Sequence, residues 1–79
     1  MKEKFKDRYE KLGLMISVYR RKKRLTQESL GEILDIDSQH ISRIERAVSG
    51  VSLDRLFEIA DALEVDVAKL FDFSLLDGR

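Results

Sequence analysis

The sequence of 79 residues contains no cysteine and no proline. Without cysteine, the chain has no disulfide framework, no thiolate metal site and no thiol nucleophile, which is typical of a protein from a reducing compartment. Its apolar runs are only a few residues long, whereas a membrane span needs about 20 residues, and the N-terminus lacks the apolar core of a secretory signal. We therefore expect one cytoplasmic domain over residues 1–79 that does not associate with membranes.

The chain also lacks an excess of charge of either sign, because 15 Lys and Arg balance 15 Asp and Glu. Neutralising phosphate dominates the affinity of DNA-binding proteins, so a net charge of zero argues at first against a nucleic-acid partner. The charges are unevenly distributed, however, with a net +4 over residues 1–46 and a net −4 over residues 47–79. The basic half can therefore bind a polyanion such as DNA while the acidic half faces away. The alternative is that the charged fraction of 38% only keeps a small domain in solution.

Apolar residues recur at helical spacing, and no segment alternates for long enough to predict a strand. The pattern predicts an all-α fold of five helices, and each of the last four follows a residue that can cap it. The first helix ends near residues 22–24, and the others follow Thr26 (to Leu34), Asp37 (residues 38–46), Ser52 and Asp66. The side chains expected to face the core are Phe5, Tyr9, Leu12, Ile16, Tyr19, Leu30, Ile33, Leu34, Ile36, Ile41, Ile44, Leu53, Leu56, Phe57, Ile59, Ala60, Leu63 and Leu70.

Residues 27–46 form two short helices with a tight turn between them. Gly31 offers the small residue that two helices need where they cross at a steep angle, and Ile41 and Ile44 help to fill that angle. This packing is typical of a helix-turn-helix, whose second helix enters the DNA major groove.

The second helix of this motif carries polar side chains on its outer face. With Ile41 and Ile44 directed inward, Gln39, Ser42, Arg43 and Arg46 point outward at 100° per residue, and Ser38 lies in the first turn. Gln can bond adenine and Arg can bond guanine, each through two hydrogen bonds, while Ser suits a base or a phosphate. Any exposed helix carries one such residue, but their occurrence together favours DNA contact.

Glu45 falls beside the apolar edge of this helix rather than on its outer face. We expect it to pair with Arg20 of the first helix, in a partly buried ion pair that sets the orientation of the two helices. The alternative is a solvent-exposed glutamate without a structural role.

The sequence resembles the Cro and phage-repressor type of helix-turn-helix domain, also called the XRE family. The resemblance covers roughly residues 12–71 and is carried by Leu12, Gly13, Ile16, Arg20, Leu25 to Glu28, Leu30, Ile41, Ser42, Ile44 to Arg46, Ser52, Leu56, Ile59, Ala60, Ala62, Leu63, Val65 and Leu70. It implies a five-helix lambda-repressor-like fold, a DNA phosphate held by Gln27, base edges facing Ser38, Gln39 and Arg43, and the Arg20–Glu45 pair.

The chain departs from the family pattern at several turns. Arg24, Asp35 and Ala47 stand where the family commonly has glycine, and Gly31 stands where alanine is usual. A left-handed backbone at such a residue costs about 1 kcal/mol. Ala47 lies in the loop whose backbone N–H groups meet phosphate in the family, so its methyl group can alter that contact.

These features predict a transcriptional regulator that binds double-stranded DNA as a homodimer on a palindrome, because one short helix reads only a few base pairs. Bases are read by Ser38, Gln39 and Arg43, and the DNA backbone is held by Gln27, His40, Ser42 and Arg46. We expect the dimer to form through residues 65–79, with the tail's apolar residues Val67, Phe71, Phe73, Leu75 and Leu76. The N-terminal turns around Phe5 and Tyr9 are a second candidate surface.

The alternative is an antitoxin or adaptor that binds proteins, with weak or no DNA contact. An enzyme is not expected, because the single histidine, His40, has no partners for a catalytic dyad or a metal cluster, and the acidic pairs occupy capping positions. We likewise expect no cofactor, metal or small-molecule ligand.

Overall fold

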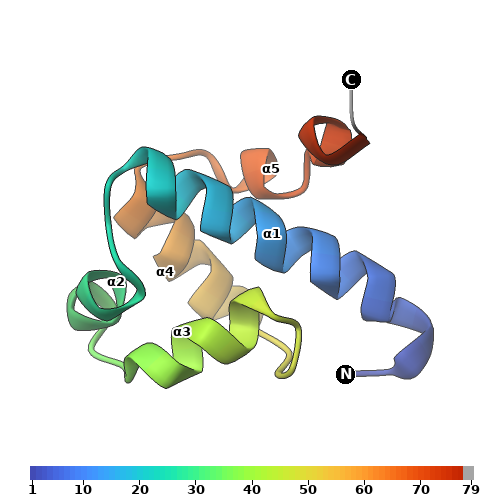
Figure 1. Ribbon diagram of the computed structural model, residues 1–79, viewed down its shortest axis with the longest axis horizontal. Coiled ribbons are helices and arrows are strands. Elements are labelled where there is room, and N and C mark those ends of the chain that lie inside the picture. Colours follow the sequence, from blue (N-terminus) through green and yellow to red (C-terminus); the bar gives the residue numbers. More distant parts are fainter. Residues whose placement is uncertain (78–79) are drawn as a thin grey trace.

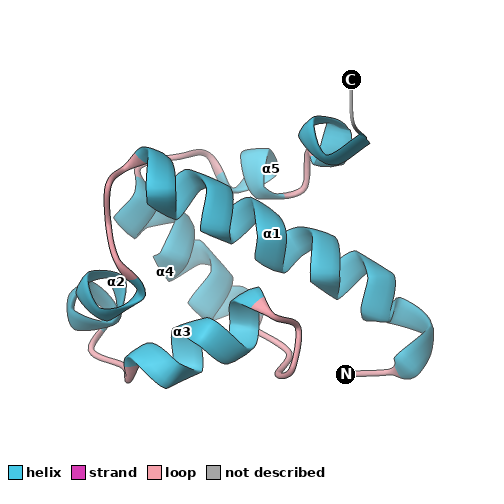
Figure 2. Ribbon diagram, in the orientation of Figure 1, coloured by secondary structure: helices cyan, strands magenta, loops and turns pink. Residues whose placement is uncertain are grey.

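The computed structural model describes residues 1–77, and this part of the chain consists of helices and loops (Figures 1 and 2). The α-helices are α1 (Lys6–Lys22), α2 (Gln27–Leu34), α3 (Ser38–Glu45), α4 (Leu53–Leu63) and α5 (Val67–Leu70), and the 3-10 helices are η1 (Glu3–Phe5) and η2 (Phe73–Asp77). The predicted all-α architecture of five helices is confirmed. The two 3-10 helices at either end were not predicted. No helix within residues 1–77 has the length and apolarity needed to cross a bilayer.

The last four α-helices begin at the capping residues that the sequence predicts. In each, the side chain of the capping residue accepts a hydrogen bond from a backbone N–H of the first turn, which would otherwise have no partner. The donor–acceptor distances are 2.9 Å from Ser29 to Thr26, 3.0 Å from Gln39 to Asp37, 3.1 Å from Arg55 to Ser52 and 3.1 Å from Ala68 to Asp66.

The long helix α1 crosses the others, with α2 and α3 on one side of it and α5 on the other (Figure 1). One cluster of buried apolar side chains joins α1 to α5: Leu12, Ile16, Leu30, Ile41, Ile44, Leu56, Ile59, Ala60, Leu63 and Leu70. Every one of these was predicted to face the core. Met15 is also fully buried, although it was not among the residues of the first helix predicted to face the core.

Three of the side chains predicted to face the core are largely exposed instead. Ile33, Leu53 and Phe57 have exposed fractions of 56%, 65% and 48%. On α4 the buried stripe consists of Leu56, Ile59, Ala60 and Leu63. Phe57 lies about 100° around the helix from Leu56, and Leu53 is the first residue of the helix, so both remain largely in solvent. A wheel drawn from sequence cannot show how much of such a surface a neighbour covers.

Two glycines set the close approach of α3 to its neighbours. A Cβ added at Gly13 would collide with the backbone carbonyl oxygens of Ile44 and Glu45, so the backbone of α1 lies directly against the end of α3. A Cβ added at Gly31 would lie 2.6 Å from the carbonyl oxygen of Ile36, in the turn between α2 and α3. The predicted need for a small residue at position 31 therefore has a direct structural cause.

Four non-glycine residues adopt a left-handed backbone: Arg24, Asp35, Ala47 and Glu64, with φ of 61°, 58°, 59° and 58°. The first three stand where the family resemblance has glycine. Glu64 was not singled out from sequence, and it ends α4. Each costs about 1 kcal/mol relative to glycine, and the surrounding helix ends hold the residues in place.

Candidate nucleic-acid interface

The outer face of α3 is open to solvent. Ile41 and Ile44 anchor the helix in the core, with exposed fractions of 1% and 3%. On the opposite side Gln39 and Arg43 are exposed, as is Arg46, which ends the helix. Ser38, His40 and Ser42 are half-buried along the edges of this face. α3 therefore presents hydrogen-bonding side chains and two guanidinium groups on one side, supported from behind by two isoleucines.

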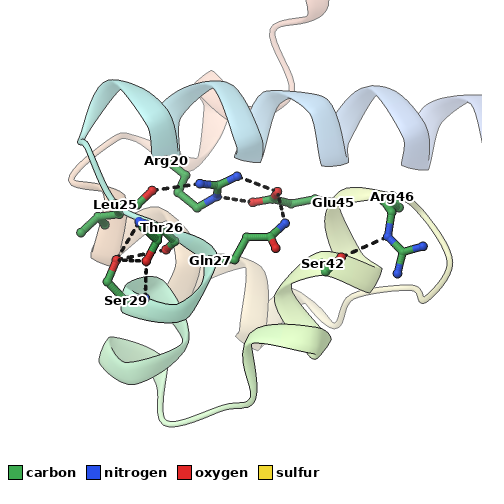
Figure 3. Close-up of polar contacts among 8 residues, drawn as sticks. All are labelled: Arg20, Leu25, Thr26, Gln27, Ser29, Ser42, Glu45 and Arg46. Carbon is green, nitrogen blue, oxygen red and sulfur yellow. Dashed lines mark hydrogen bonds and ion pairs between the residues drawn. The ribbon is translucent and has the colours of Figure 1, made fainter.

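A buried ion pair fixes the end of α3 against α1 (Figure 3). Arg20 Nε lies 2.7 Å from Glu45 Oε2, and a second guanidinium nitrogen donates to Glu45 Oε1 at 3.1 Å. The remaining nitrogen of Arg20 donates to the backbone carbonyl of Leu25 at 2.9 Å, just before α2 begins. Arg20 and Glu45 form the pair expected from sequence, and together they connect α1, α3 and the entry to α2.

Gln27 joins this pair from the first position of α2. Its side-chain Nε2 donates a hydrogen bond of 3.0 Å to Glu45 Oε1, as Figure 3 shows. Sequence reasoning assigned Gln27 to a DNA phosphate and missed this contact. A helical wheel of α3 does not show that the first turn of α2 packs next to Glu45. An amide nitrogen carries two hydrogens, so Gln27 can hold Glu45 and still donate a second bond outward.

Arg46 is held along the surface of α3 by a hydrogen bond from its Nε to Ser42 Oγ at 3.0 Å (Figure 3). This contact leaves the terminal nitrogens of the guanidinium group directed away from the helix. Because the side chain is already ordered, less conformational entropy is lost when it binds a partner.

In the loop after α3, three backbone N–H groups donate hydrogen bonds to carbonyl groups of α3. The N–H of Ala47 donates to the carbonyl of Ile44 at 3.1 Å, and those of Val48 and Ser49 donate to the carbonyl of Arg43 at 2.9 and 3.3 Å. The Ala47 side chain is buried beneath this turn. These three amide groups are therefore not directed outward as free donors, in contrast to the phosphate-binding loop that the family resemblance implies.

The residues expected to form a dimer lie on the far side of α1 from α3. Phe71 and Leu75 are exposed, while Val67, Phe73 and Leu76 are half-buried. Residues 78 and 79 of the expected segment lie outside the described residues. Hydrogen bonds from the hydroxyl and the backbone N–H of Ser74 lower the pKa of Asp72, which lies between Phe71 and Phe73 in the sequence.

The two candidate dimer surfaces meet in one apolar pocket of about 420 Å³. Phe5 and Tyr9 at the start of α1, Leu53 at the start of α4, and Phe71 and Phe73 after α5 all line it. The sequence identified both ends of the chain as candidates but did not predict that they lie together. Among residues 1–77, no three His, Cys, Asp or Glu side chains gather closely enough to hold a metal ion.

Comparison with known families and curated proteins identifies relatives of this chain. A helix-turn-helix family model, HTH_3, matches residues 16–70. Two uncharacterized HTH-type transcriptional regulators, from Rickettsia conorii and Rickettsia prowazekii, are each 31% identical to it over 61 residues. The matched region is 77% of this chain but 49% and 47% of theirs, so the chain spans about half the length of the curated relatives it matches.

Two solved structures share the fold. The restriction-modification controller protein C.AhdI from Aeromonas hydrophila matches with a TM-score of 0.76 and 30% identity, covering 80% of this chain and 96% of that protein. The clp gene regulator ClgR from C. glutamicum matches with a TM-score of 0.80 and 25% identity, covering 90% of this chain and 92% of that one.

Proposed function

The chain belongs to the helix-turn-helix family and has the lambda-repressor-like fold of its solved relatives, and we propose that it regulates transcription by sequence-specific binding to duplex DNA. The observation that carries the proposal is the open outer face of α3, where Gln39 and Arg43 stand exposed on a helix anchored by buried isoleucines. The relatives named above are HTH-type transcriptional regulators, a restriction-modification controller protein and a clp gene regulator, which supports a role in gene control.

In this proposal Ser38, Gln39 and Arg43 read base edges in the major groove. Gln39 suits adenine and Arg43 suits guanine, because each side chain can place two hydrogen bonds on one base edge. Both side chains are exposed and lie on consecutive turns of α3, so one helix can reach adjacent base pairs.

Contacts to the DNA backbone come from Gln27, His40, Ser42 and Arg46. Gln27 begins the motif in sequence and Arg46 ends it, and each is already held by a hydrogen bond, to Glu45 and to Ser42 respectively. Phosphate contacts fix the register of the helix on the duplex, and contacts to base edges then read the sequence.

The protein acts as a two-fold homodimer on a palindromic operator. One recognition helix reads only a few base pairs, so two copies spaced one helical turn apart are needed for useful specificity. The exposed apolar side chains after α5 support a dimer surface within residues 65–77, continuous with the pocket beside Phe5 and Tyr9. In Figure 1, α5 and η2 lie across α1 from α3, so a dimer formed through them leaves the recognition helix uncovered.

Selection of binding sites from random duplexes tests the DNA proposal. We expect an inverted repeat with half-sites about 10 base pairs apart. The Arg43→Ala variant should then lose preference at one base pair in each half-site by about 1–3 kcal/mol. A uniform loss at every position would make Arg43 a phosphate contact instead. If the wild-type protein shows no salt-dependent binding to any duplex, the DNA proposal fails and a protein-binding adaptor or antitoxin is favoured.

Sedimentation of the wild type and two matched variants tests the dimer. Phe71 and Phe57 are both about half exposed, but only Phe71 lines the apolar pocket. We expect Phe71→Asp to shift the protein toward monomer and Phe57→Asp to leave the dimer intact. A monomeric wild type, or equal effects of the two substitutions, would place the subunit contact elsewhere or remove it.

A further inference from the structure

The N-terminal segment lies beside the loop that follows α3. A Cβ built on Gly50 would sit 3.9 Å from Cβ of Met1 and 3.9 Å from Cε1 of Tyr9, so this loop touches both the first residue and the second turn of α1. Figure 1 shows the blue N-terminal end next to the yellow loop, at the end of α3 that points away from α2. The segment therefore extends the surface formed by α3.

This segment is basic and its charges face solvent. Lys2 and Lys4 are exposed, Lys6 is half-buried, and Glu3 is the one acidic residue among the first six. The next acidic side chain, Asp7, has its charge offset by Lys11, whose Nζ lies 3.4 Å from it. A net positive charge is thus placed beside the loop, in a chain whose overall charge is zero.

Phe5 anchors the segment to the body of the molecule. The ring lies half-buried in the apolar pocket, with Lys4 Nζ 5.3 Å and the Arg8 guanidinium carbon 5.1 Å from its centroid. These distances are within the range of cation–π attraction, so Phe5 holds the neighbouring cations near the surface. The lysines are therefore presented by an ordered helical turn.

Three backbone donors of the loop beside these lysines are already engaged within the protein. The N–H groups of Ala47, Val48 and Ser49 already donate to carbonyl groups of α3. A phosphate lying at this end of α3 requires other positive or hydrogen-bonding groups. Lysine supplies a flexible point charge that suits this task.

We propose that Lys2 and Lys4 form a DNA phosphate contact that takes the place of the engaged amides of residues 47–49. The proposal rests on the proposed function, that the chain binds duplex DNA. It assigns a role in binding to residues that lie outside the family match at 16–70. The contact would add affinity for any sequence without changing which bases are read, because phosphate contacts carry no base information.

The test measures how the affinity of the full chain for a mixed-sequence duplex depends on salt. We expect the slope of log affinity against log salt for Lys2→Gln/Lys4→Gln to be smaller than that of the wild type by about 1 to 2, since each neutralised phosphate contributes about 0.9. Lys2→Arg/Lys4→Arg keeps the charge and should keep the wild-type slope. Lys69→Gln removes one charge on α5, across α1 from α3, and should also leave the slope unchanged.

The outcomes separate this proposal from the one on which it rests. If the wild type binds in a salt-dependent manner but Lys2→Gln/Lys4→Gln has the same slope, only the N-terminal contact is wrong. An equal loss of slope in Lys69→Gln would also overturn it, because the effect would then follow total charge. A wild type without salt-dependent binding would remove the DNA proposal itself. Unfolding temperatures should change little throughout, because Lys2, Lys4 and Lys69 are exposed and the contact of Lys4 with the Phe5 ring adds only a small stabilisation at an exposed site.

Discussion

α3 and α4 follow the same local rules, yet they present opposite surfaces. Each begins after a capping side chain and buries a stripe of aliphatic residues in the shared core. The outer face of α3 carries Gln39 and Arg43, whereas that of α4 carries Asp54, Glu58 and Asp61. A polyanion is attracted to the first face and repelled by the second. The buried residues of each helix thus stabilise the fold, and the exposed residues decide which helix can bind DNA.

The two helices also differ in how they use a glutamate. Glu45 of α3 is buried and bound by Arg20 and Gln27, while Glu58 of α4 pairs with Arg55 at 2.9 Å on the surface. An exposed pair is solvated when it breaks, but a buried charge that loses its partner is not. The same residue type therefore has a structural role in one helix and a minor one in the other.

The largest expected effect comes from removing these glutamates one at a time. Glu45→Ala leaves the Arg20 guanidinium buried without its partner and should lower the free energy of unfolding by about 3–5 kcal/mol. Glu58→Ala is the matched control and should cost about 0–1 kcal/mol. Urea unfolding measures both. Similar losses in the two variants would show that burial does not distinguish the two pairs.

The close packing of α3 against α1 can be tested at Gly13 of α1. Gly13→Ala places a methyl group against the carbonyl oxygens of Ile44 and Glu45 and should destabilise the protein by about 1–3 kcal/mol. Gly50→Ala adds the same group where the nearest atoms are 3.9 Å away, and should change stability by less than about 0.5 kcal/mol. Thermal unfolding compares them, and a neutral Gly13→Ala would mean that α1 and α3 can separate without loss.

The outer faces can be compared by their effect on DNA binding. Gln39→Ala should reduce discrimination at one adenine position by about 1–3 kcal/mol while leaving other positions unchanged. Asp61→Asn on α4 should leave base preference intact and raise affinity uniformly, and only slightly, because charges beyond about 10 Å are screened at physiological salt. Competition with single-base operator variants measures both, and loss of preference in Asp61→Asn would contradict the division of roles between the helices.

The smallest effect is expected at Ala47 and Glu64, the residues with a left-handed backbone that follow α3 and α4. Glu64→Gly relieves backbone strain after α4 and should stabilise the protein by up to about 1 kcal/mol, reduced by loss of the exposed Lys23 pair. Ala47→Gly relieves similar strain after α3 but removes a buried methyl group worth about 0.8 kcal/mol, so its net effect should be near zero. Calorimetry resolves the difference, and a larger gain at position 47 would reverse the comparison.

Sequence reasoning placed the outer face of α3 well but misjudged the edges of the other helices. The direction of Arg43 follows from its spacing to Ile41 and Ile44 within one helix, so no tertiary information is needed. Leu53 and Phe57 required knowledge of what lies opposite α4, and both are exposed against expectation. The apolar pocket escaped prediction for the same reason, because it joins residues from both ends of the chain.

The amino-acid sequence by itself determined where the helices begin and which residues cap them, since capping and helical periodicity depend on neighbours within about one turn. It also determined the left-handed turn at Asp35, where the chain must reverse direction within a few residues. The tertiary structure alone decided that Gln27 binds Glu45, that Met15 is buried, and that the loop amides after α3 are engaged. These contacts depend on how whole helices pack, and packing is settled by the shapes of surfaces distant in sequence.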